Sequence, residues 1–330
     1  MREHEIRPEA LLKRYVELSA EDARHCFSDD SRVPVACVAC GGIDAAFQFE
    51  KNGFEYVRCA ACSTLFLSPR PSRAAFEAYY RNSESSRYWA EVFFPAVAEV
   101  RREKMFRPRV DRLAGICRER GIRVEHLVDV GAGYGIFLDE WRARFPGTEL
   151  LAVEPSAPLA RECRSKGLTV VEDIVENGTG RGGLADVVTC FEVLEHVHTP
   201  LDFVRVLKGL ARPGGWVCVS TLCVDGFDLQ MLWEKSVQIS PPHHINFLSV
   251  RGFDQLFSRA GLEAVVVTTP GQLDVEIVRN AAERDPGLLM GHRFLQAMLA
   301  RDGTPARFQE FLSANRLSSH AWIMGRRAER

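Results

Sequence analysis

The sequence predicts an α/β protein built on a mostly parallel sheet and preceded by a small cysteine-bound module. From residue 125 onward, short apolar strands alternate with amphipathic helices, which is typical of a parallel sheet with helical crossovers. Before that point, two Cys-x-x-Cys pairs stand close together in a segment that is poor in core residues. We therefore expect four parts: an N-terminal helical segment (1–36), the cysteine module (37–70), a helical lid or linker (71–124) and the α/β domain (125–330).

The amino-acid composition favours a globular enzyme over a nucleic-acid-binding or membrane-binding protein. With 330 residues, 46% hydrophobic and 26% charged, the chain fits a soluble globular enzyme. The balance of 42 basic against 44 acidic residues gives no overall attraction to nucleic acid or to anionic lipid. Residues 1–15 lack the apolar core of a signal peptide, and no apolar run approaches 18 residues. We expect a cytoplasmic protein without membrane insertion, whose ten cysteines are thiols rather than disulfides.

Four of these cysteines have the spacing of a zinc site. Eighteen residues separate "CVAC" from "CAAC", within the range for a four-thiolate ion. Between the pairs, an alternating apolar and polar pattern breaks at Asn52-Gly53, a hairpin signal. The pattern predicts a zinc ribbon with a structural Zn²⁺. Its expected ligands are Cys37, Cys40, Cys59 and Cys62.

The linker is expected to be helical. Ser72 is placed to cap a helix after an extended exit at Pro69 and Pro71. The aromatic residues that follow are core or line a substrate pocket: Tyr79, Tyr80, Tyr88, Trp89, Phe93 and Phe94. Residues 100–123 carry nine Lys or Arg against three Asp or Glu, which indicates either a solvated helix face or a patch that meets phosphates.

The α/β part opens with an apolar strand, 126–131, that runs into a turn with glycines at 131, 133 and 135. Glycines allow a sharp turn and a close backbone approach to a ligand. A helix with Phe137, Leu138 and Trp141 on one face follows. The next strand ends in Glu154, 23 residues after Gly131, where an acid can accept hydrogen bonds from ribose hydroxyls. Further strands are expected at 168–173, from 185 and at 216–221, the last after a Pro-Gly-Gly turn.

Four motifs in this order, "LVDVGAGYG", "LLAVEPS", "CFEVLEHV" and "LARPGGWVCVST", resemble class I S-adenosylmethionine-dependent methyltransferases. Ile136 stands where a dehydrogenase turn has its last glycine, which argues against a nicotinamide enzyme. The resemblance implies a Rossmann-like sheet, a helical insertion at about 270–316 and a final, antiparallel edge strand in "SSHAWIMGRRA". Together with the cysteine module, it points to bacterial methyltransferases of nucleotide-linked sugars or surface polysaccharides.

The resemblance also implies roles for individual residues. Asp129 and the glycine turn would hold the methionine end of S-adenosylmethionine, and Glu154 the ribose. Asp173, or Glu172 beside it, would meet the adenine, while Phe191 and Glu192 would pass under the sulfonium. The implied cofactor-binding set is Asp129, Gly131, Ala132, Gly133, Gly135, Glu154, Pro155, Asp173, Phe191 and Glu192.

The candidate catalytic residues stand in "PPHHINFLS", on the connection after the fifth strand. A histidine there can take a proton from the methyl acceptor, so His244 and His243 are the expected bases, unless they pack a structural loop. In similar sugar C-methyltransferases this loop reads Tyr-x-Glu-His, whereas here Pro241 and His243 replace the tyrosine and the acid. We therefore expect O-methylation of a small molecule, namely a sugar, a nucleotide-linked sugar or a polysaccharide precursor, with N-methylation as a further alternative. An RNA methyltransferase, a sugar C-methyltransferase and a non-catalytic cofactor-binding scaffold remain alternatives.

Overall fold

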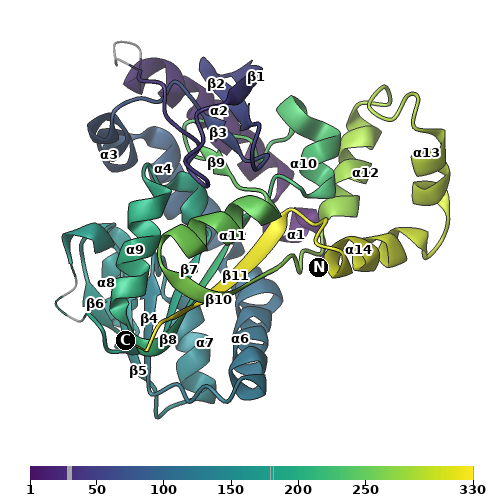
Figure 1. Cartoon of the computed structure of the whole chain (residues 1–330). Coiled ribbons are helices and arrows are strands. Elements are labelled where there is room, and N and C mark those ends of the chain that lie inside the picture. Colours follow the sequence, from purple (N-terminus) through teal and green to yellow (C-terminus); the bar gives the residue numbers. More distant parts are fainter. Residues whose placement is uncertain (28–31, 179, 181, 330) are drawn as a thin grey trace. The chain divides into compact units, whose positions relative to one another are not determined.

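The computed structural model describes residues 1–27, 32–178, 180 and 182–329. The chain folds into two compact units, each assembled from three stretches of sequence, whereas the organisation expected from sequence consists of contiguous segments. The first unit comprises Met1–Phe93, Thr221–Phe253 and Val267–Trp322. The second comprises Phe94–Ser220, Asp254–Val266 and Ile323–Arg330. Figure 1 labels the elements of both.

The second unit contains most of a seven-stranded sheet with the order β10-β11-β8-β7-β4-β5-β6. The strands are β4 (His126–Val130), β5 (Glu149–Val153), β6 (Thr169–Val171), β7 (Ala185–Phe191), β8 (Ala211–Leu222), β10 (Leu262–Thr268) and β11 (His320–Arg327). Strands β6, β5, β4, β7 and β8 pair in parallel, and the predicted Rossmann-like sheet with one antiparallel strand is confirmed.

The expected edge position of the last strand was wrong. Strand β11 lies between β8 and β10, and β10 is the edge strand. The helical connection between β10 and β11 lets the chain return beside β8, where β11 has a hydrogen-bonded neighbour on each side. A strand with two neighbours leaves no row of backbone groups unpaired, which favours this position over an edge.

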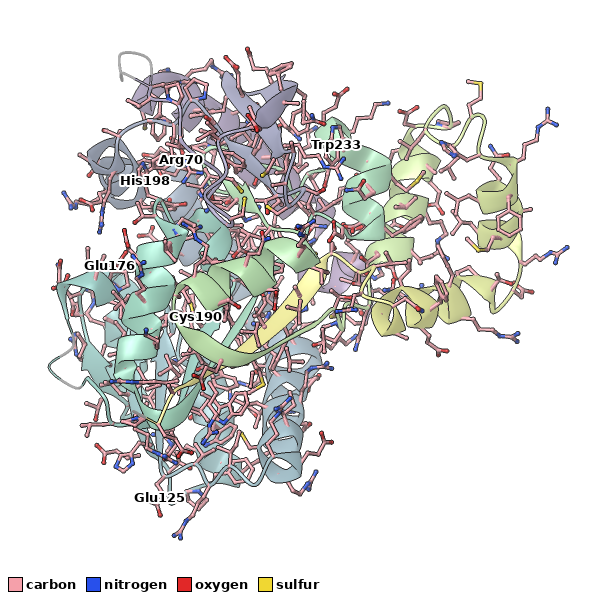
Figure 2. The ribbon with its side chains drawn as sticks, in the orientation of Figure 1. Arg70, Glu125, Glu176, Cys190, His198 and Trp233 are labelled. Carbon is pink, nitrogen blue, oxygen red and sulfur yellow. The ribbon has the colours of Figure 1, made fainter. Side chains whose placement is uncertain are left out.

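Three helical segments of the second unit precede β4 and the others follow strands of the sheet, as the order of the elements and Figure 1 show. They are α5 (Phe94–Arg101), η2 (Arg102–Phe106), α6 (Arg107–Glu119), α7 (Ile136–Arg144), α8 (Ala157–Ser165), η3 (Val175–Asn177), η4 (Leu194–His196) and α9 (Pro200–Leu210). Phe137, Leu138 and Trp141 of α7 are buried, as predicted. Strand β7 is buried along its whole length, and Cys190 on it, labelled in Figure 2, has no exposed surface.

The first unit contains a four-stranded sheet with the order β1-β2-β3-β9. Its strands are β1 (Ala45–Lys51), β2 (Phe54–Cys59), β3 (Leu65–Leu67) and β9 (Asn246–Phe247). Asn52 and Gly53 both have positive φ, 50° and 76°, and form the two-residue turn that the Asn-Gly pair predicts. Strand β9, which begins one residue after the histidine pair, was not expected in this sheet.

The helices of the first unit come from all three of its stretches of sequence. They are α1 (Glu3–Ile6), α2 (Glu9–Cys26), α3 (Arg73–Asn82), α4 (Glu84–Tyr88), η1 (Trp89–Phe93), α10 (Phe227–Leu232), η5 (Trp233–Lys235), α12 (Asp274–Arg284), α13 (Arg293–Ala300) and α14 (Thr304–Ala314). Helix α11 (Val250–Arg259) includes residues of both units. The Ser72 hydroxyl accepts a hydrogen bond from the Ala75 amide, so the predicted cap of α3 is confirmed.

Aromatic side chains dominate the core of the first unit. Phe27 lies 5.4 Å from Phe54 and 5.2 Å from Phe76 between ring centroids, and these rings belong to one buried cluster. Trp233, labelled in Figure 2, packs edge-on against Phe49 at its margin. No helix in the part of the chain that the structure describes is long and apolar enough to cross a membrane.

Candidate functional site

The turn after β4 has the backbone that its glycines predict. Gly131, Gly133 and Gly135 have φ values of 74°, 57° and 68°, in the left-handed region that favours glycine. At Gly131 a Cβ atom would lie 2.5 Å from a methyl group of Val193, so this position also excludes a side chain by contact. A Cβ at Gly133 would meet no atom within 4 Å. The turn is therefore open at Gly133 and closely packed at Gly131.

Glu154 connects the end of β5 to this turn. Its side chain is 5% exposed, and its two carboxylate oxygens accept hydrogen bonds from the amides of Gly133 (2.8 Å) and Ser156 (2.9 Å). Burial raises the pKa of the Glu154 carboxyl, against the effect of these two donors. A carboxylate has about four lone-pair sites, so each oxygen retains one that can accept a further donor. A ribose diol has the two hydroxyl donors that this group can accept.

Asp129 is the second buried acid of the site. The Thr189 hydroxyl donates to it at 2.7 Å from the neighbouring strand β7. Burial raises the pKa of Asp129 from 3.8 to about 7, although the Thr189 hydrogen bond opposes the shift. A desolvated carboxyl beside a glycine turn can hold a cationic group, as the methionine end of S-adenosylmethionine requires.

Glu192, at the carboxyl end of β7, has a strained backbone and forms an ion pair with Arg109. Glu192 has a φ of +56°, unusual for a residue with a side chain. Its carboxylate accepts hydrogen bonds from Ser220 (2.6 Å) and from Arg109 of α6 (2.8 Å). The Arg109 guanidinium also lies 5.2 Å from the ring centre of Phe191, within the range of a cation–π contact. These contacts fix Phe191 and Glu192 at the carboxyl end of the strand.

The remaining predicted cofactor residues differ in exposure. Ala132 is buried, while Pro155 is exposed at the start of the loop after β5. Asp173 is exposed and accepts hydrogen bonds from the Ile174 amide (2.7 Å) and the Asn177 side chain (2.8 Å), so it organises its own turn. Open glycine backbone, Glu154 and Asp129 together fit S-adenosylmethionine. Asp129 is the penultimate residue of β4, the glycine turn follows β4, and Glu154 follows the neighbouring parallel strand β5, so all three lie at the carboxyl ends of adjacent strands.

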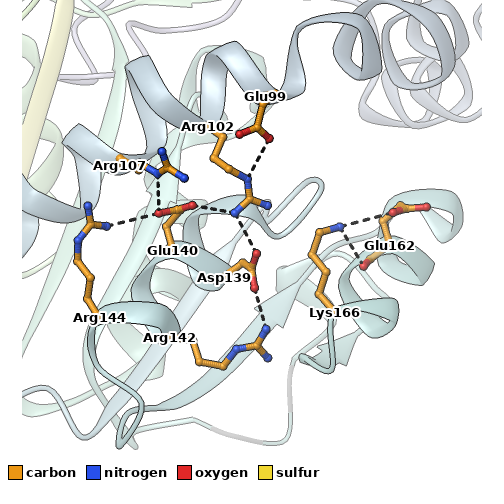
Figure 3. A network of polar contacts seen from close by, with 9 residues as sticks. All are labelled: Glu99, Arg102, Arg107, Asp139, Glu140, Arg142, Arg144, Glu162 and Lys166. Carbon is orange, nitrogen blue, oxygen red and sulfur yellow. Dashed lines mark hydrogen bonds and ion pairs between the residues drawn. The ribbon is translucent and has the colours of Figure 1, made fainter.

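Several basic residues of segment 100–123 form ion pairs within their own unit. Arg102 lies 3.0 Å from Asp139 and 2.8 Å from Glu140, and Arg107 lies 3.1 Å from Glu140. Figure 3 shows that Arg142 and Arg144 complete the same network. Carboxylates of α7 therefore balance the charges of Arg102 and Arg107, which leaves less of the positive charge of this segment available to bind phosphates.

His244 lies in the first unit with a defined ring orientation. Its Nδ1 lies 2.5 Å from the carbonyl oxygen of Gln238, which can only accept, so Nδ1 carries the proton in this contact. The neutral ring then has its lone pair on Nε2. This arrangement selects the tautomer that a general base needs. His244 is half-buried, in contrast to its neighbour.

His243 is only 4% exposed and lies among hydroxyl groups. Its Nε2 is 2.5 Å from the Tyr79 hydroxyl and 3.0 Å from that of Ser85. Ser85 in turn donates to the carboxylate of Asp22 on α2, and the ring of Tyr15 lies 5.1 Å away. The structure thus gives the two histidines different surroundings, one half-buried and one in a buried polar chain.

The four module cysteines are brought together. Their sulfur atoms all lie within 4.8 Å of one another, with 3.5 Å between Cys37 and Cys62 and between Cys40 and Cys59. A tetrahedral Zn²⁺ with Zn–S bonds of about 2.3 Å has sulfur–sulfur edges of about 3.8 Å. The hydrogen bond with Cys37 lowers the pKa of the Cys62 thiol to about 4. The cluster therefore fits a small zinc site. The other six cysteines are scattered thiols, as expected.

Sequence reasoning missed two kinds of residue. Arg109 was counted only as part of a charged segment, yet it is 7% exposed and bound to Glu192. Tyr56 gave no signal beyond its alternating strand pattern, yet its hydroxyl donates to the backbone of His244. Both roles depend on contacts between residues 83 and 188 positions apart, which a single sequence does not encode locally.

Part of the chain is similar in sequence to curated O-methyltransferases. A ubiquinone biosynthesis O-methyltransferase of Bordetella bronchiseptica is 39% identical over 105 residues, which cover 30% of this chain and 43% of that protein. Another protein of that name, from Methylococcus capsulatus, is 41% identical over 102 residues, covering 29% and 42%. The chain thus spans less than half the length of these relatives.

Solved structures show the same fold at low identity. The plantazolicin methyltransferase BamL, in complex with a triazolic desmethylPZN analog and SAH, has a TM-score of 0.51 at 14% identity, covering 77% of this chain and 94% of that one. A SAM-dependent methyltransferase from Archaeoglobus fulgidus has a TM-score of 0.50 at 14% identity, covering 72% and 100%. At this identity the likeness concerns the fold alone.

The family itself is shown by a profile match. The profile described as "Methyltransferase domain" matches residues 97–267, more than half of the chain. This region contains the glycine turn, Glu154, Asp129 and the strained Glu192. The chain therefore belongs to the methyltransferase-domain family.

Proposed function

We propose that the protein transfers a methyl group from S-adenosylmethionine to a hydroxyl oxygen of a small-molecule acceptor. The family membership and the two buried acids at the glycine turn support the cofactor. The O-methyltransferase names of the curated relatives support oxygen as the receiving atom. Within this class we propose a sugar, a nucleotide-linked sugar or a polysaccharide precursor as the acceptor, on the sequence resemblance alone.

The observation that carries the chemistry is the ring orientation of His244. Its Nδ1–H donates to the Gln238 carbonyl, so Nε2 is the nitrogen that can take the proton of an attacking hydroxyl. The bound cofactor would supply an electrophilic methyl group. The task of the chain is to orient the hydroxyl in line with that group and to remove its proton, and a positioned general base contributes about 10²- to 10⁴-fold.

We assign His243 a different role in this proposal. Its Nε2 already contacts Tyr79 and Ser85, and the ring has almost no exposed surface. A base must reach the acceptor, directly or through one water. His244 is more exposed than His243 and is therefore the better candidate for the base, whereas His243 would hold the loop.

We also propose that Cys37, Cys40, Cys59 and Cys62 hold a structural Zn²⁺ in a ribbon-like module. The cluster consists of four thiols, which is the ligand set of structural zinc sites. Four thiolates would complete a tetrahedral coordination and leave no position for a water or a substrate. The three strands around it contribute Phe49, Phe54, Tyr56, Leu65 and Leu67 to the buried cluster of the first unit, and metal binding would add folding free energy to this packing.

An RNA acceptor is less well supported. Nucleic-acid binding draws on unpaired basic side chains that neutralise phosphates. In segment 100–123, however, Arg102 and Arg107 contact Glu140, and Arg109 contacts Glu192. The net charge of −2 for the whole chain points the same way.

Methyl transfer from radiolabelled S-adenosylmethionine tests the proposal. We expect label on one member of a panel of nucleotide-linked sugars, free sugars and phenols, and none on total RNA. His244→Ala should lower the turnover at least 100-fold while cofactor affinity stays within about twofold, because the cofactor residues are untouched. His25→Ala, an exposed histidine at the end of α2, is the matched control. Labelling of RNA alone, or full activity of His244→Ala, would contradict the proposal.

A further inference from the structure

We propose that the four-cysteine module is the positioning device for His244, so that metal binding by the cysteines fixes the base. This inference rests on the proposed function and adds a role for the module. It assigns Tyr56 and Asn52 as positioning residues, which act on the reaction through the loop. Three sets of contacts within the first unit carry the inference.

The first contact is a shared sheet. Residues 246 and 247 form β9, which pairs antiparallel with β3, with Leu65 opposite Phe247 and Phe66 opposite Asn246. The Leu67 amide also donates to the Ile245 carbonyl at 3.0 Å. The residue next to His244 is thus bonded to the module, and the segment that follows is the fourth strand of its sheet.

The second contact is a clamp from the hairpin. The Tyr56 hydroxyl donates to the main-chain oxygen of His244 at 2.5 Å, and the Asn52 amide donates to that of Pro241 at 3.2 Å. Tyr56 has no exposed surface and lies three residues before Cys59 on β2. The hairpin thereby holds both the start of the loop and the base itself by their backbone oxygens.

The third contact joins the loop to the cysteines directly. The Ser249 hydroxyl donates to the carbonyl oxygen of Cys62 and accepts from the amide of Gly252 at 2.8 Å. Cys59 ends β2 and Cys62 precedes β3 in the chain, so an ion that fixes their sulfurs also fixes the two strands that carry the loop. Hydrogen bonds therefore connect the metal ligands to the loop that carries His244.

His243 secures the loop from the opposite side. Its ring contacts Tyr79 of α3 and Ser85 of α4, and Ser85 donates to Asp22 of α2. The Tyr80 hydroxyl donates to the His243 carbonyl at 3.1 Å. The loop is thus held between helices and hairpin. Because a displacement of about 1 Å can cost about 10²-fold in rate, loss of one clamp should be visible in turnover.

Tyr56→Phe tests the inference, since it removes one hydroxyl and leaves every cysteine in place. We expect amide hydrogen exchange in residues 243–249 to become at least about tenfold faster, while metal content and affinity for S-adenosylhomocysteine stay within about twofold. With an acceptor in hand, kcat should fall about tenfold with little change in KM. Gln48→Ala is the control, because Gln48 lies on the same hairpin and its side chain donates to backbone oxygens of its own strand. Unchanged exchange in Tyr56→Phe would overturn the inference.

Metal removal gives the second arm. A chelator that removes the metal should also make amide hydrogen exchange in residues 243–249 faster, and the affinity for S-adenosylhomocysteine should stay within about twofold. Protection that survives metal loss would also overturn the inference. Hydrogen exchange needs no methyl acceptor, so a failure of the proposed function can be distinguished from a failure of this inference. A wild-type protein without transferase activity contradicts the proposed function, whereas unaltered exchange contradicts only the coupling.

Discussion

Arg109 and Glu192 form an ion pair with 2.8 Å between guanidinium and carboxylate, although Arg109 is only 7% exposed. The pair joins α6 to the carboxyl end of β7, where Glu192 has a positive φ. The same guanidinium lies over the ring of Phe191. A side chain from the basic segment thus stabilises the strained end of the strand.

Replacing Arg109 by Met should destabilise the protein by about 1 to 2 kcal/mol, because it leaves a partly buried carboxylate without its cation. Arg123→Met is the matched control. Arg123 lies 2.9 Å from Glu125, but 87% of its side chain is exposed, so its loss should change stability by less than about 0.5 kcal/mol. Urea unfolding of both variants measures the difference, and equal effects would show that burial does not matter here.

Gly131→Ala should destabilise the second unit more than Gly121→Ala. Both residues have positive φ, 74° and 66°, so each alanine incurs about 1 kcal/mol of backbone strain. Only Gly131 adds a contact at 2.5 Å with Val193, which should cost about 1 to 3 kcal/mol more. Thermal unfolding of the two variants should therefore separate strain from overpacking. Equal losses would mean that Val193 moves aside without cost.

Asp129 should give the protein a pH-dependent stability. Because its pKa rises from 3.8 to about 7 on folding, the native state binds the proton more tightly than the unfolded chain. Its contribution to stability is full below about pH 4 and is lost as the pH rises to about 7. Asp129→Asn should remove this part, so the variant should gain stability relative to the wild type between pH 4 and 7. Denaturant midpoints of the wild type and of Asp129→Asn at pH 4 and pH 7 measure this change. A difference in stability between the two proteins that is the same at both pH values would contradict the assigned pKa.

The cysteine cluster should bind one metal ion per chain. Cys62→Ser should lose the metal, because it removes one of four ligands, and the module should then unfold at lower temperature. Cys26→Ser, which alters an exposed cysteine outside the cluster, should keep the full metal content. Elemental analysis of both purified variants gives the result. Stoichiometric metal in Cys62→Ser would rule out this ligand set.

Local signals predicted the parts of the fold that depend on local chemistry. The Asn52-Gly53 turn, the Ser72 cap and the apolar face of α7 each follow from a residue type at a fixed position. The glycine turn and Glu154 could be placed on successive strands for the same reason.

Long-range pairing could not be predicted in this way. The final strand was placed at the sheet edge, but β11 lies between β8 and β10, a choice made by backbone pairing across more than 50 residues. Likewise, Asn246 and Phe247 have no strand signal in the sequence, and they form a strand only because they pair with β3. The sequence could not decide whether the basic segment is a solvated helix face or a phosphate patch, because carboxylate partners of Arg102 and Arg107 lie in α7.

Binding of S-adenosylhomocysteine, measured by titration calorimetry, tests the central claim most directly. We predict one site per chain in the wild type and at least tenfold weaker binding in Glu154→Gln, because a charge-assisted hydrogen bond contributes about 1.5 to 3 kcal/mol. Glu149→Gln, at the opposite end of β5, should bind within about twofold of the wild type. No binding by the wild type, or equal binding by Glu154→Gln, would contradict the account.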